Sequence, residues 1–418
     1  MTTPLFTGSE WDFDMIARAL DECGIIAQEL KLNTYRNQIE VITSEQMLDA
    51  YASVGMPIYY KHWSFGKKFS REQDLYQKGK SGLAYELVIN SNPCINYLME
   101  ANTACVQTLV IAHAAYGHNH FFKNNYLYKQ WTDAEGIVDY LVFARNYVNE
   151  CEEKYGIDRV EATLDAAHAL MVNGVDRYKR PRKLSLAKEQ ERQKDRIAYL
   201  EKNVNDLWRT LPKSNKTKEV KLERFPKDPE ENLLYFLEKN SPILETWQRE
   251  LLRIVRKIAQ YFYPQYQTKV MNEGWASFCH YYIMNRLYDK SLLTEGAMLE
   301  FIKLHTGVLY QPSYNSRYYS GFNPYYLGFE IFNDIKRICT EPTEEDLTWF
   351  PDLKGADWLD VCLDAVENYR DESFIRQYLS PHMMRKLRLF SLSDDKSETR
   401  SEEHTSELQS HVRISYAV

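Results

Sequence analysis

Residues 271–283 place two ionisable side chains on one face of a predicted helix whose other residues are mostly aromatic, apolar or small. Glu273 and His280 are seven positions apart, about two turns of an α-helix, so both side chains point the same way. A helix inside a protein carries such groups on its buried side only when they are paired or bind a metal. The fold must therefore bring a polar partner against this helix.

The run 110–125 is the candidate partner. His113, His118 and His120 fall within eight residues there, out of ten histidines in the chain. A regular α-helix would set His113 and His118 about 140° apart, since each residue turns by about 100°. We therefore expect the helix to end at Gly117, because glycine adopts the left-handed C-cap conformation without strain. Such an end would let both histidines face one ligand.

Helical periodicity and capping signals predict a mainly α fold, a single multi-helix catalytic body with minor short strands. Thr43 is a predicted N-cap, and Asn323-Pro324 combines an N-cap residue with proline at the first helical position. Asn92-Pro93 predicts a helix start in the same way. Residues 83–90 and 310–322 are the strand candidates.

Three zones are expected along the chain. They are an N-terminal helical part at 1–182 with His113, His118 and His168, a charged helix and mobile linker at 183–232, and a second helical part at 233–390 with Glu273 and His280. Since both helical parts carry candidate ligands, we expect them to pack as one body.

Composition excludes several classes of protein. A formal net charge of −7 argues against nucleic acid as a partner. No apolar run reaches the ~20 residues that a transmembrane helix needs, and the N-terminus lacks the pattern of an export signal. The seven cysteines are scattered without a Cys-x-x-Cys pair, as expected for reduced thiols. These features predict a cytoplasmic protein.

Seven segments together carry a resemblance to a known family. They are 62–69 (HWSFGKKF), 85–90 (YELVIN), 112–125 (AHAAYGHNHFFKNN), 164–170 (LDAAHAL), 174–179 (GVDRYK), 272–276 (NEGWA) and 323–329 (NPYYLGF). The chain resembles the SpoVR-like family of bacteria, named after stage V sporulation protein R. His120 stands where many spore formers have an aspartate, so the form is similar to the proteobacterial branch. The resemblance implies a role in spore cortex formation, or in stress and envelope adaptation, but no particular reaction.

Residues 400–418 resemble the translation of a sequencing-library adapter. We therefore expect the native sequence to end near Thr399, with residues 391–399 beginning a C-terminal region that is truncated here. His404 and His411 are accordingly not counted as site residues.

A second resemblance concerns the chemistry of Glu273. Residues 272–276 are similar to the Asn-Glu-Gly-Phe-Ala segment of gluzincin aminopeptidases, which implies that Glu273 is a zinc ligand. His113 and His118 would complete a set of two histidines and a carboxylate, with His280 and His168 as further metal residues. The chain lacks the His-Glu-x-x-His motif of those peptidases, so a separate glutamate must activate water. Glu86 and Glu161 are the candidates for this base.

The helix containing Glu161 leaves another arrangement open. Asp165 and His168 follow Glu161 at four and seven residues, and their own i, i+3 spacing occurs in dinuclear carboxylate sites of helical proteins. Iron with Asp165 as a ligand would then give an oxidase-like protein. Whether Asp165 or His120 binds a metal stays open at this stage.

The leading hypothesis is a zinc-dependent hydrolase-like site that acts on a peptide or amide bond, with a peptide or glycan-peptide as the substrate. Iron is the less favoured metal. The rival hypothesis is a non-enzymatic regulatory or scaffold protein that acts with partner proteins and whose polar centre only fixes the fold.

Overall fold

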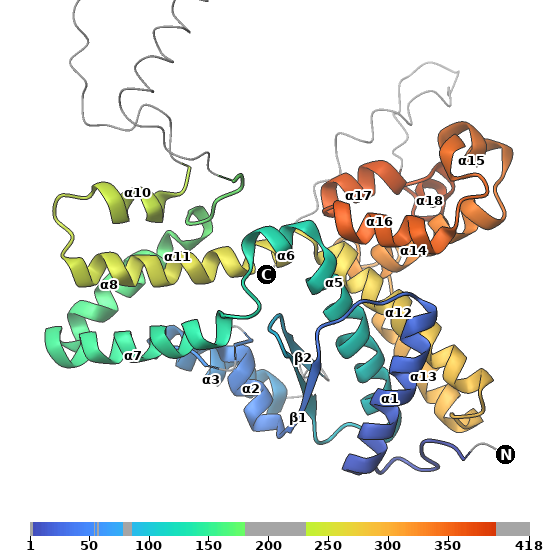
Figure 1. Cartoon of the computed structure of the whole chain (residues 1–418), viewed down its shortest axis with the longest axis horizontal. Helices are drawn as coiled ribbons and strands as arrows, with labels where there is room; N and C mark the ends of the chain where they lie inside the picture. Colours follow the sequence, from blue (N-terminus) through green and yellow to red (C-terminus); the bar gives the residue numbers. More distant parts are fainter. Residues whose placement is uncertain (1–2, 54, 57, 78–85, 180–230, 390–418) are drawn as a thin grey trace, which may run out of the picture. The chain divides into compact units, whose positions relative to one another are not determined.

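The computed structural model describes residues 3–53, 55–56, 58–77, 86–179 and 231–389. Nearly all of the predicted charged helix and linker at 183–232 lies outside these residues, as do 391–399 and the adapter-like segment 400–418. The chain divides into two compact units, one formed by Met1–Ala162 with Gln260–Val418 and the other by Thr163–Ala259. Helices dominate the described residues, which confirms the predicted mainly α class (Figure 1).

The first unit contains a small sheet. Its strands are β1 (Asn37–Ile42), β2 (Glu86–Ile89) and β3 (Cys94–Met99), in the order β1-β3-β2. β1 runs parallel to β3 with Asn37 opposite Cys94, and β2 runs antiparallel with Glu86 opposite Leu98. Only β2 lies within a predicted strand region. The other predicted region, 310–322, consists of turns and irregular backbone and contains no strand.

The N-terminal part of the first unit supplies a series of helices. They are α1 (Phe13–Glu29), α2 (Ser44–Ala52), α3 (Trp63–Gln77), α4 (Ala104–Val110), the π-helix η1 (Ile111–His118), α5 (Asn119–Asn124), α6 (Tyr126–Trp131) and α7 (Ile137–Tyr155). The segments α4, η1 and α5 follow one another without interruption, so they form one continuous helical rod.

The C-terminal part of the same unit is also helical. Its elements are α12 (Lys269–Asp289), α13 (Glu295–Val308), α14 (Pro324–Thr340), α15 (Glu344–Trp349), the 3-10 turn η4 (Pro351–Leu353), α16 (Trp358–Asn368), α17 (Asp371–Tyr378) and α18 (Pro381–Lys386). None of the helices described is long and apolar enough to cross a membrane.

Two of the three predicted N-caps are confirmed. The Thr43 side chain accepts a hydrogen bond from the backbone of Gln46 at the start of α2, and Asn323 caps α14 with Pro324 at its first turn. The Asn92-Pro93 prediction is wrong, because this peptide bond is cis and leads into β3 instead of a helix. Proline at this position suits a turn as well as a helix start.

Helix α12 is the centre of the first unit and is buried on most of its faces. Its glycine and alanine positions allow two neighbours to approach closely. A Cβ atom on Gly328 of α14 would lie 2.1 Å from the Val270 carbonyl oxygen, and one on Gly117 of η1 would lie 2.6 Å from the Cα of Ala276. Real Cβ atoms do not approach so closely. Helices α12, α14 and η1 are therefore in backbone contact, which places the polar residues of η1 against those of α12.

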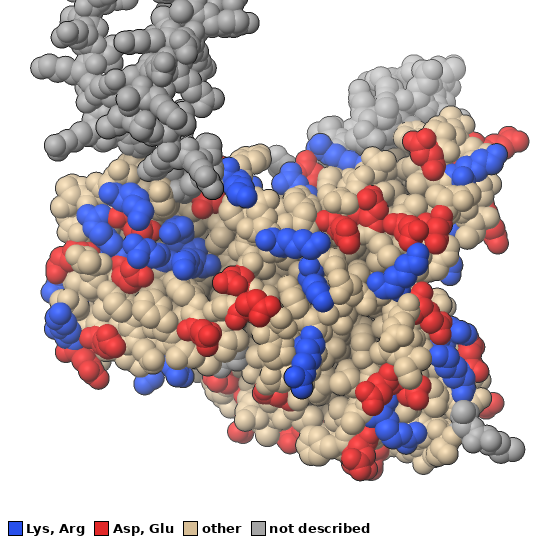
Figure 2. Space-filling model, in the orientation of Figure 1, with Lys and Arg blue, Asp and Glu red and all other residues tan. Residues whose placement is uncertain are grey.

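The second unit contains the end of α8 (Ile157–Ala169), the 3-10 turn η2 (Met171–Asn173), α10 (Leu233–Asn240) and most of α11 (Thr246–Gln267). Glu238 of α10 is buried and lies 3.0 Å from Arg253 and 3.2 Å from Arg256 of α11. Figure 2 shows basic side chains gathered over α10 and α11. Because Glu238 pairs with two of these arginines, part of the positive charge is neutralised within the unit itself.

Candidate metal centre

The histidine-rich run is a π-helix, so our expectation that the helix ends at Gly117 is wrong. The rod continues through η1 into α5, and Gly117 has no left-handed conformation. A π-helix is wider than an α-helix because its hydrogen bonds join residues five apart. His113 and His118 are five apart, so the π-helix brings them to the same side, and their ring centroids are 4.6 Å from each other. Gly117 instead lets η1 touch Ala276 of α12.

Two carboxylates from β2 and α12 lie beside this pair, so that four side chains from three elements meet. The Nε2 atom of His113 lies 3.4 Å from Oε1 of Glu86 on β2 and 3.8 Å from Oε2 of Glu273 on α12. The Nε2 atom of His118 lies 3.4 Å from the same Glu273 oxygen. Ligand atoms of Glu86, His113 and His118 all lie within 4.8 Å of one another, close enough to hold one metal ion.

The tautomer of His118 is fixed by the residue before Glu273. His118 Nδ1 lies 2.9 Å from Oδ1 of Asn272, and an amide oxygen only accepts hydrogen bonds, so Nδ1 is the donor. In the neutral ring, Nε2 then has a free lone pair that faces Glu273. A hydrogen bond from the remote ring nitrogen is the usual support of a metal-binding histidine.

His113 is supported by two further histidines. Its Nδ1 atom lies 2.8 Å from Nδ1 of His280, and Nε2 of His280 lies 2.7 Å from Nδ1 of His305 on α13. All three rings are buried. Burial, with His113 and His305 as neighbours, holds the pKa of His280 well below its usual value. Burial likewise lowers the pKa of His305 to about 4, so both rings are neutral near pH 7.

The two carboxylates differ in their electrostatic surroundings. Burial raises the pKa of Glu273, but the adjacent His113 and His118 lower it more, so the net pKa is well below its usual range. Burial also raises the pKa of Glu86, and the same histidines compensate only in part, so its net pKa is above its usual value. Glu273 is therefore the more firmly ionised of the two.

Solvent and Tyr325 border the cluster on its open side. The side chains of Glu86 and Glu273 are 21% and 19% exposed, whereas those of His113 and His118 are 7% and 9% exposed. The ring of Tyr325, in the first turn of α14, lies 6.4 Å from that of His113 in a stacked orientation. The charge of Glu273 and then burial keep the pKa of the Tyr325 hydroxyl well above its usual value, so this group stays protonated.

The other predicted metal residues occupy different positions. His280 contacts Nδ1 of His113 and, like Glu273, is not one of the three residues (Glu86, His113 and His118) whose ligand atoms all lie within 4.8 Å of one another. His120 accepts a hydrogen bond at Nδ1 from the Asn33 backbone and lies against Trp275. Asp165, which is exposed, and half-buried His168 belong to the second unit.

Glu161, the alternative base, is half-buried on α8 within the first unit and is not part of the cluster of Glu86, His113 and His118.

His305 and Asn272 are the site residues that the sequence reasoning missed. His305 lies 25 residues after His280 with no other histidine near it in the sequence, and nothing in its local pattern distinguishes it from a packed core histidine. Asn272 had a detectable signal, because it directly precedes Glu273 within a segment that the resemblance had singled out.

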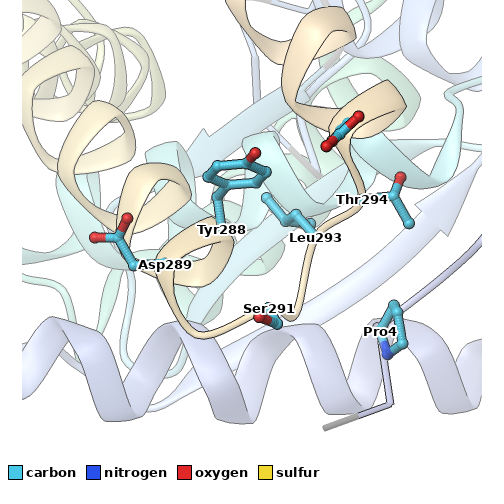
Figure 3. Close-up of a pocket in the computed structure, with 7 residues that line it drawn as sticks. Pro4, Tyr288, Asp289, Ser291, Leu293 and Thr294 are labelled. Atoms are coloured by element: carbon cyan, nitrogen blue, oxygen red, sulfur yellow. The ribbon is translucent and has the colours of Figure 1, made fainter. Parts of the chain in front are cut away.

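A surface hollow at the far end of α12 is separate from this cluster. It has a volume of about 630 Å³ and is lined by Pro4, Tyr288, Asp289, Ser291, Leu293, Thr294 and Glu295 (Figure 3). Asp289 ends α12, sixteen residues after Glu273, which corresponds to about 24 Å along a helix axis. The hollow therefore contributes nothing to the metal centre.

Comparison with known proteins agrees with the resemblance seen in the sequence. The family described as "SpoVR like protein" matches residues 10–416. A relative named "Uncharacterized protein YcgB" from Escherichia coli (strain K12) is 62% identical over 395 residues, which cover 94% of this chain and 78% of that protein. This identity to a proteobacterial protein agrees with the branch inferred from the histidine run. No solved structure matches the chain. On the extent of these matches, the chain belongs to the SpoVR-like family.

Proposed function

We propose that the chain binds a divalent metal, with zinc as the best fit, and hydrolyses an amide bond in a peptide or glycan-linked peptide. The observation that carries the proposal is the meeting of Glu86, His113, His118 and Glu273 at one partly exposed point of the first unit. Two imidazoles with carboxylates are a donor set that zinc favours.

The surroundings of one carboxylate oxygen of Glu273 favour a positive charge at this position. Its Oε2 atom is buried without a hydrogen-bond partner, although the Nε2 atoms of His113 and His118 lie within 3.8 Å. Because Asn272 makes Nδ1 the donor of His118, the lone pair of Nε2 faces the carboxylate oxygen directly. Two acceptor atoms in such a position repel each other unless a positive charge joins them, and either a proton on Nε2 or a bound metal ion supplies that charge.

In this proposal the two carboxylates have different roles, one as a metal ligand and the other as a general base. Glu273 contacts both histidines and is the more firmly ionised, so we assign it as the third ligand. Glu86 contacts His113 alone and holds a proton more readily, which suits a general base that takes a proton from water and returns it to the leaving amine. Zinc, when bound, supplies a Lewis acid that lowers the pKa of water to about 7. Tyr325 offers a protonated hydroxyl beside Glu273.

The biological setting belongs to the proposal and rests on the resemblance to the family, and the cytoplasmic location rests on the composition of the chain. We infer a cytoplasmic protein in stress or envelope adaptation, or in spore cortex formation where the organism sporulates. The rival proposal, a regulatory scaffold that acts through partner proteins, treats the same four side chains as structural. An oxidase-like iron site would need Asp165 as a ligand, and this exposed residue belongs to the second unit.

The test distinguishes the proposed metal ligand, Glu273, from the proposed general base, Glu86. Zinc content and release of amines from a peptide and glycan-peptide library are measured for the parent, Glu273→Gln and Glu86→Gln. We expect Glu273→Gln to lose metal and activity together, and Glu86→Gln to keep the metal but lose activity by about 100-fold or more. Retention of full activity by both variants would refute the assignment. Loss of metal in Glu86→Gln would make Glu86 a ligand.

A further inference from the structure

Three buried imidazoles form an unbroken chain that starts at the metal centre. His113 of η1, His280 of α12 and His305 of α13 are joined nitrogen to nitrogen at 2.8 Å and 2.7 Å. The first member faces the carboxylates through Nε2, while its Nδ1 begins the chain. His280 uses both ring nitrogens within the chain, so it links the other two rings directly.

When all three rings are neutral, proton counting allows only two arrangements of this chain. A neutral imidazole carries one N–H, and each N···N hydrogen bond needs one donor and one acceptor. If His280 carries its proton on Nε2, then His113 donates from Nδ1, its Nε2 is bare, and the proton of His305 lies on Nε2. If His280 carries its proton on Nδ1 instead, His113 accepts at Nδ1 and carries its own proton on Nε2. His305 then donates from Nδ1, and its Nε2 is bare. The tautomer of His113 is therefore tied to that of His305.

The packing around the chain keeps the rings from rotating out of it. The ring of Phe301 lies edge-on to His280, with centroids 6.1 Å apart. His305 stacks with Tyr281 at 4.9 Å and meets Phe329 edge-on at 5.1 Å. With the rings fixed, a change of state moves one proton along each of the two hydrogen bonds, while water takes the proton that leaves Nε2 of one end ring and supplies the proton that Nε2 of the other end ring gains.

We propose that the three imidazoles switch tautomer together, so that metal loading at His113 is coupled to the proton position on His305. The inference rests on the metal centre proposed above. A metal needs the bare Nε2 of His113, which selects the state with the proton of His305 on Nε2. Without metal, the opposite state turns the Nε2–H of His113 toward Glu86 and Glu273, at 3.4 Å and 3.8 Å. His280 and His305 are thus positioning residues for His113.

The direct test is nitrogen NMR on the full chain with labelled histidine, recorded during titration with zinc alone. A His305→Asn variant assigns the resonances of His305. The expected result is that His305 carries its proton on Nδ1 before zinc is added and on Nε2 afterwards. Zinc binding with an unchanged His305 tautomer would overturn the coupling and leave the metal centre standing. Absence of zinc binding to the parent protein would overturn both.

Zinc affinity of variants gives an independent readout. His305→Phe fits the aromatic surroundings but removes the acceptor for His280, so zinc should bind about 10- to 100-fold more weakly. His305→Asn keeps a side-chain oxygen near the position of Nδ1 and should restore most of the affinity. The matched control is His382→Phe at an exposed histidine of α18, which should bind zinc like the parent. Equal affinities for parent and His305→Phe, with circular dichroism showing both folded, would contradict the proposal.

Discussion

At the scale of single residues, the candidate centre depends on which ring nitrogen of each histidine carries a proton. Asn272 sets this for His118 through one hydrogen bond at 2.9 Å. His280 contacts Nδ1 of His113 through an imidazole nitrogen, which can donate or accept, so the proton position on His113 depends on that on His280. Both supporting residues lie on α12, eight positions apart, with Glu273 between them. One helix therefore supplies a proposed ligand and orients the two others.

Substitution of Asn272 tests this orientation. In Asn272→Ala, His118 loses the acceptor for its Nδ1–H, so Nε2 is no longer held toward Glu273. Loss of such a supporting contact typically weakens metal binding about 10- to 100-fold. Competition with a fluorescent zinc chelator measures the change, and Asn285→Ala, on a more exposed turn of the same helix, is the control. Equal affinity of the two variants would show that Asn272 does not orient His118.

Protons should compete with the metal at His118. Burial lowers the pKa of this ring, but the Glu273 carboxylate raises it more, and the net pKa lies above the usual value. The protonated ring cannot bind a metal. Zinc affinity should therefore fall as the pH decreases from about 8 to about 6, the range around the usual histidine pKa of ~6.5. Isothermal titration calorimetry at several pH values measures this, and an affinity that is constant over the range would count against His118 as a ligand.

At the scale of elements, the site depends on close helix contacts and on a stretch of π-helix. The π-helix aligns His113 with His118, and Gly117 lets this segment rest on α12. The second close contact, between Gly274 and Gly328, holds α14 and its Tyr325 on the other side of α12. A side chain at the first contact would push the two ligand-bearing segments η1 and α12 apart, and one at the second would separate α14 from α12.

Gly117→Ala should therefore be costly for both stability and binding. Its Cβ would lie 2.6 Å from Cα and 2.9 Å from Cβ of Ala276, so the two helices must separate. Overpacking of this kind typically lowers the free energy of unfolding by about 1–3 kcal/mol. The control is Gly307→Ala in α13, where a Cβ meets nothing within 4 Å. Urea denaturation compares them, and an unaltered midpoint for Gly117→Ala would contradict the close contact.

A buried ion pair joins α14 to α15. Arg337 donates to both carboxylate oxygens of Asp346, at 2.6 Å and 2.9 Å. These hydrogen bonds hold the pKa of Asp346 well below its usual range, against the opposing effect of burial. Since the folded pKa is depressed, the stabilisation is fully present above the unfolded pKa of ~3.9 and is lost as the pH falls below it.

Asp346→Asn should lower the free energy of unfolding by about 1–3 kcal/mol at pH 7, because it removes one of the two carboxylates that pair with Arg337 and leaves only Asp334, at 2.7 Å. The difference between the parent and the variant should shrink as the pH is lowered below about 4. Chemical denaturation at several pH values tests both statements. A difference that does not depend on pH would mean that the charge of Asp346 contributes nothing.

At the scale of the whole molecule, residues far apart in the sequence build one site. His113 and His118 come from the part of the first unit before residue 162, and Glu273, His280 and His305 come from the part after residue 260. Ligands from both parts would tie them together when metal is bound, so metal binding and folding of this unit should be thermodynamically linked.

Parts of this arrangement could be predicted from sequence, for physical reasons. Thr43 and Asn323 were predictable as caps because capping depends on neighbouring residues only. Glu273 stood out because a charged residue on an aromatic helix face needs a partner. The π-helix, by contrast, follows from packing of η1 against α12, and His305 gains its role only through contact with His280. Such long-range causes leave no local pattern in the sequence.

The proposed metal centre consists of Glu86, His113, His118 and Glu273. Its most direct test is metal analysis by mass spectrometry on full-length, untagged protein without the adapter-like residues, alongside Glu273→Ala and His113→Ala. We expect nearly one zinc per chain in the parent and loss of the metal in both variants, with helix content retained. A parent protein that folds normally and binds no metal after incubation with zinc would contradict it and favour the scaffold role.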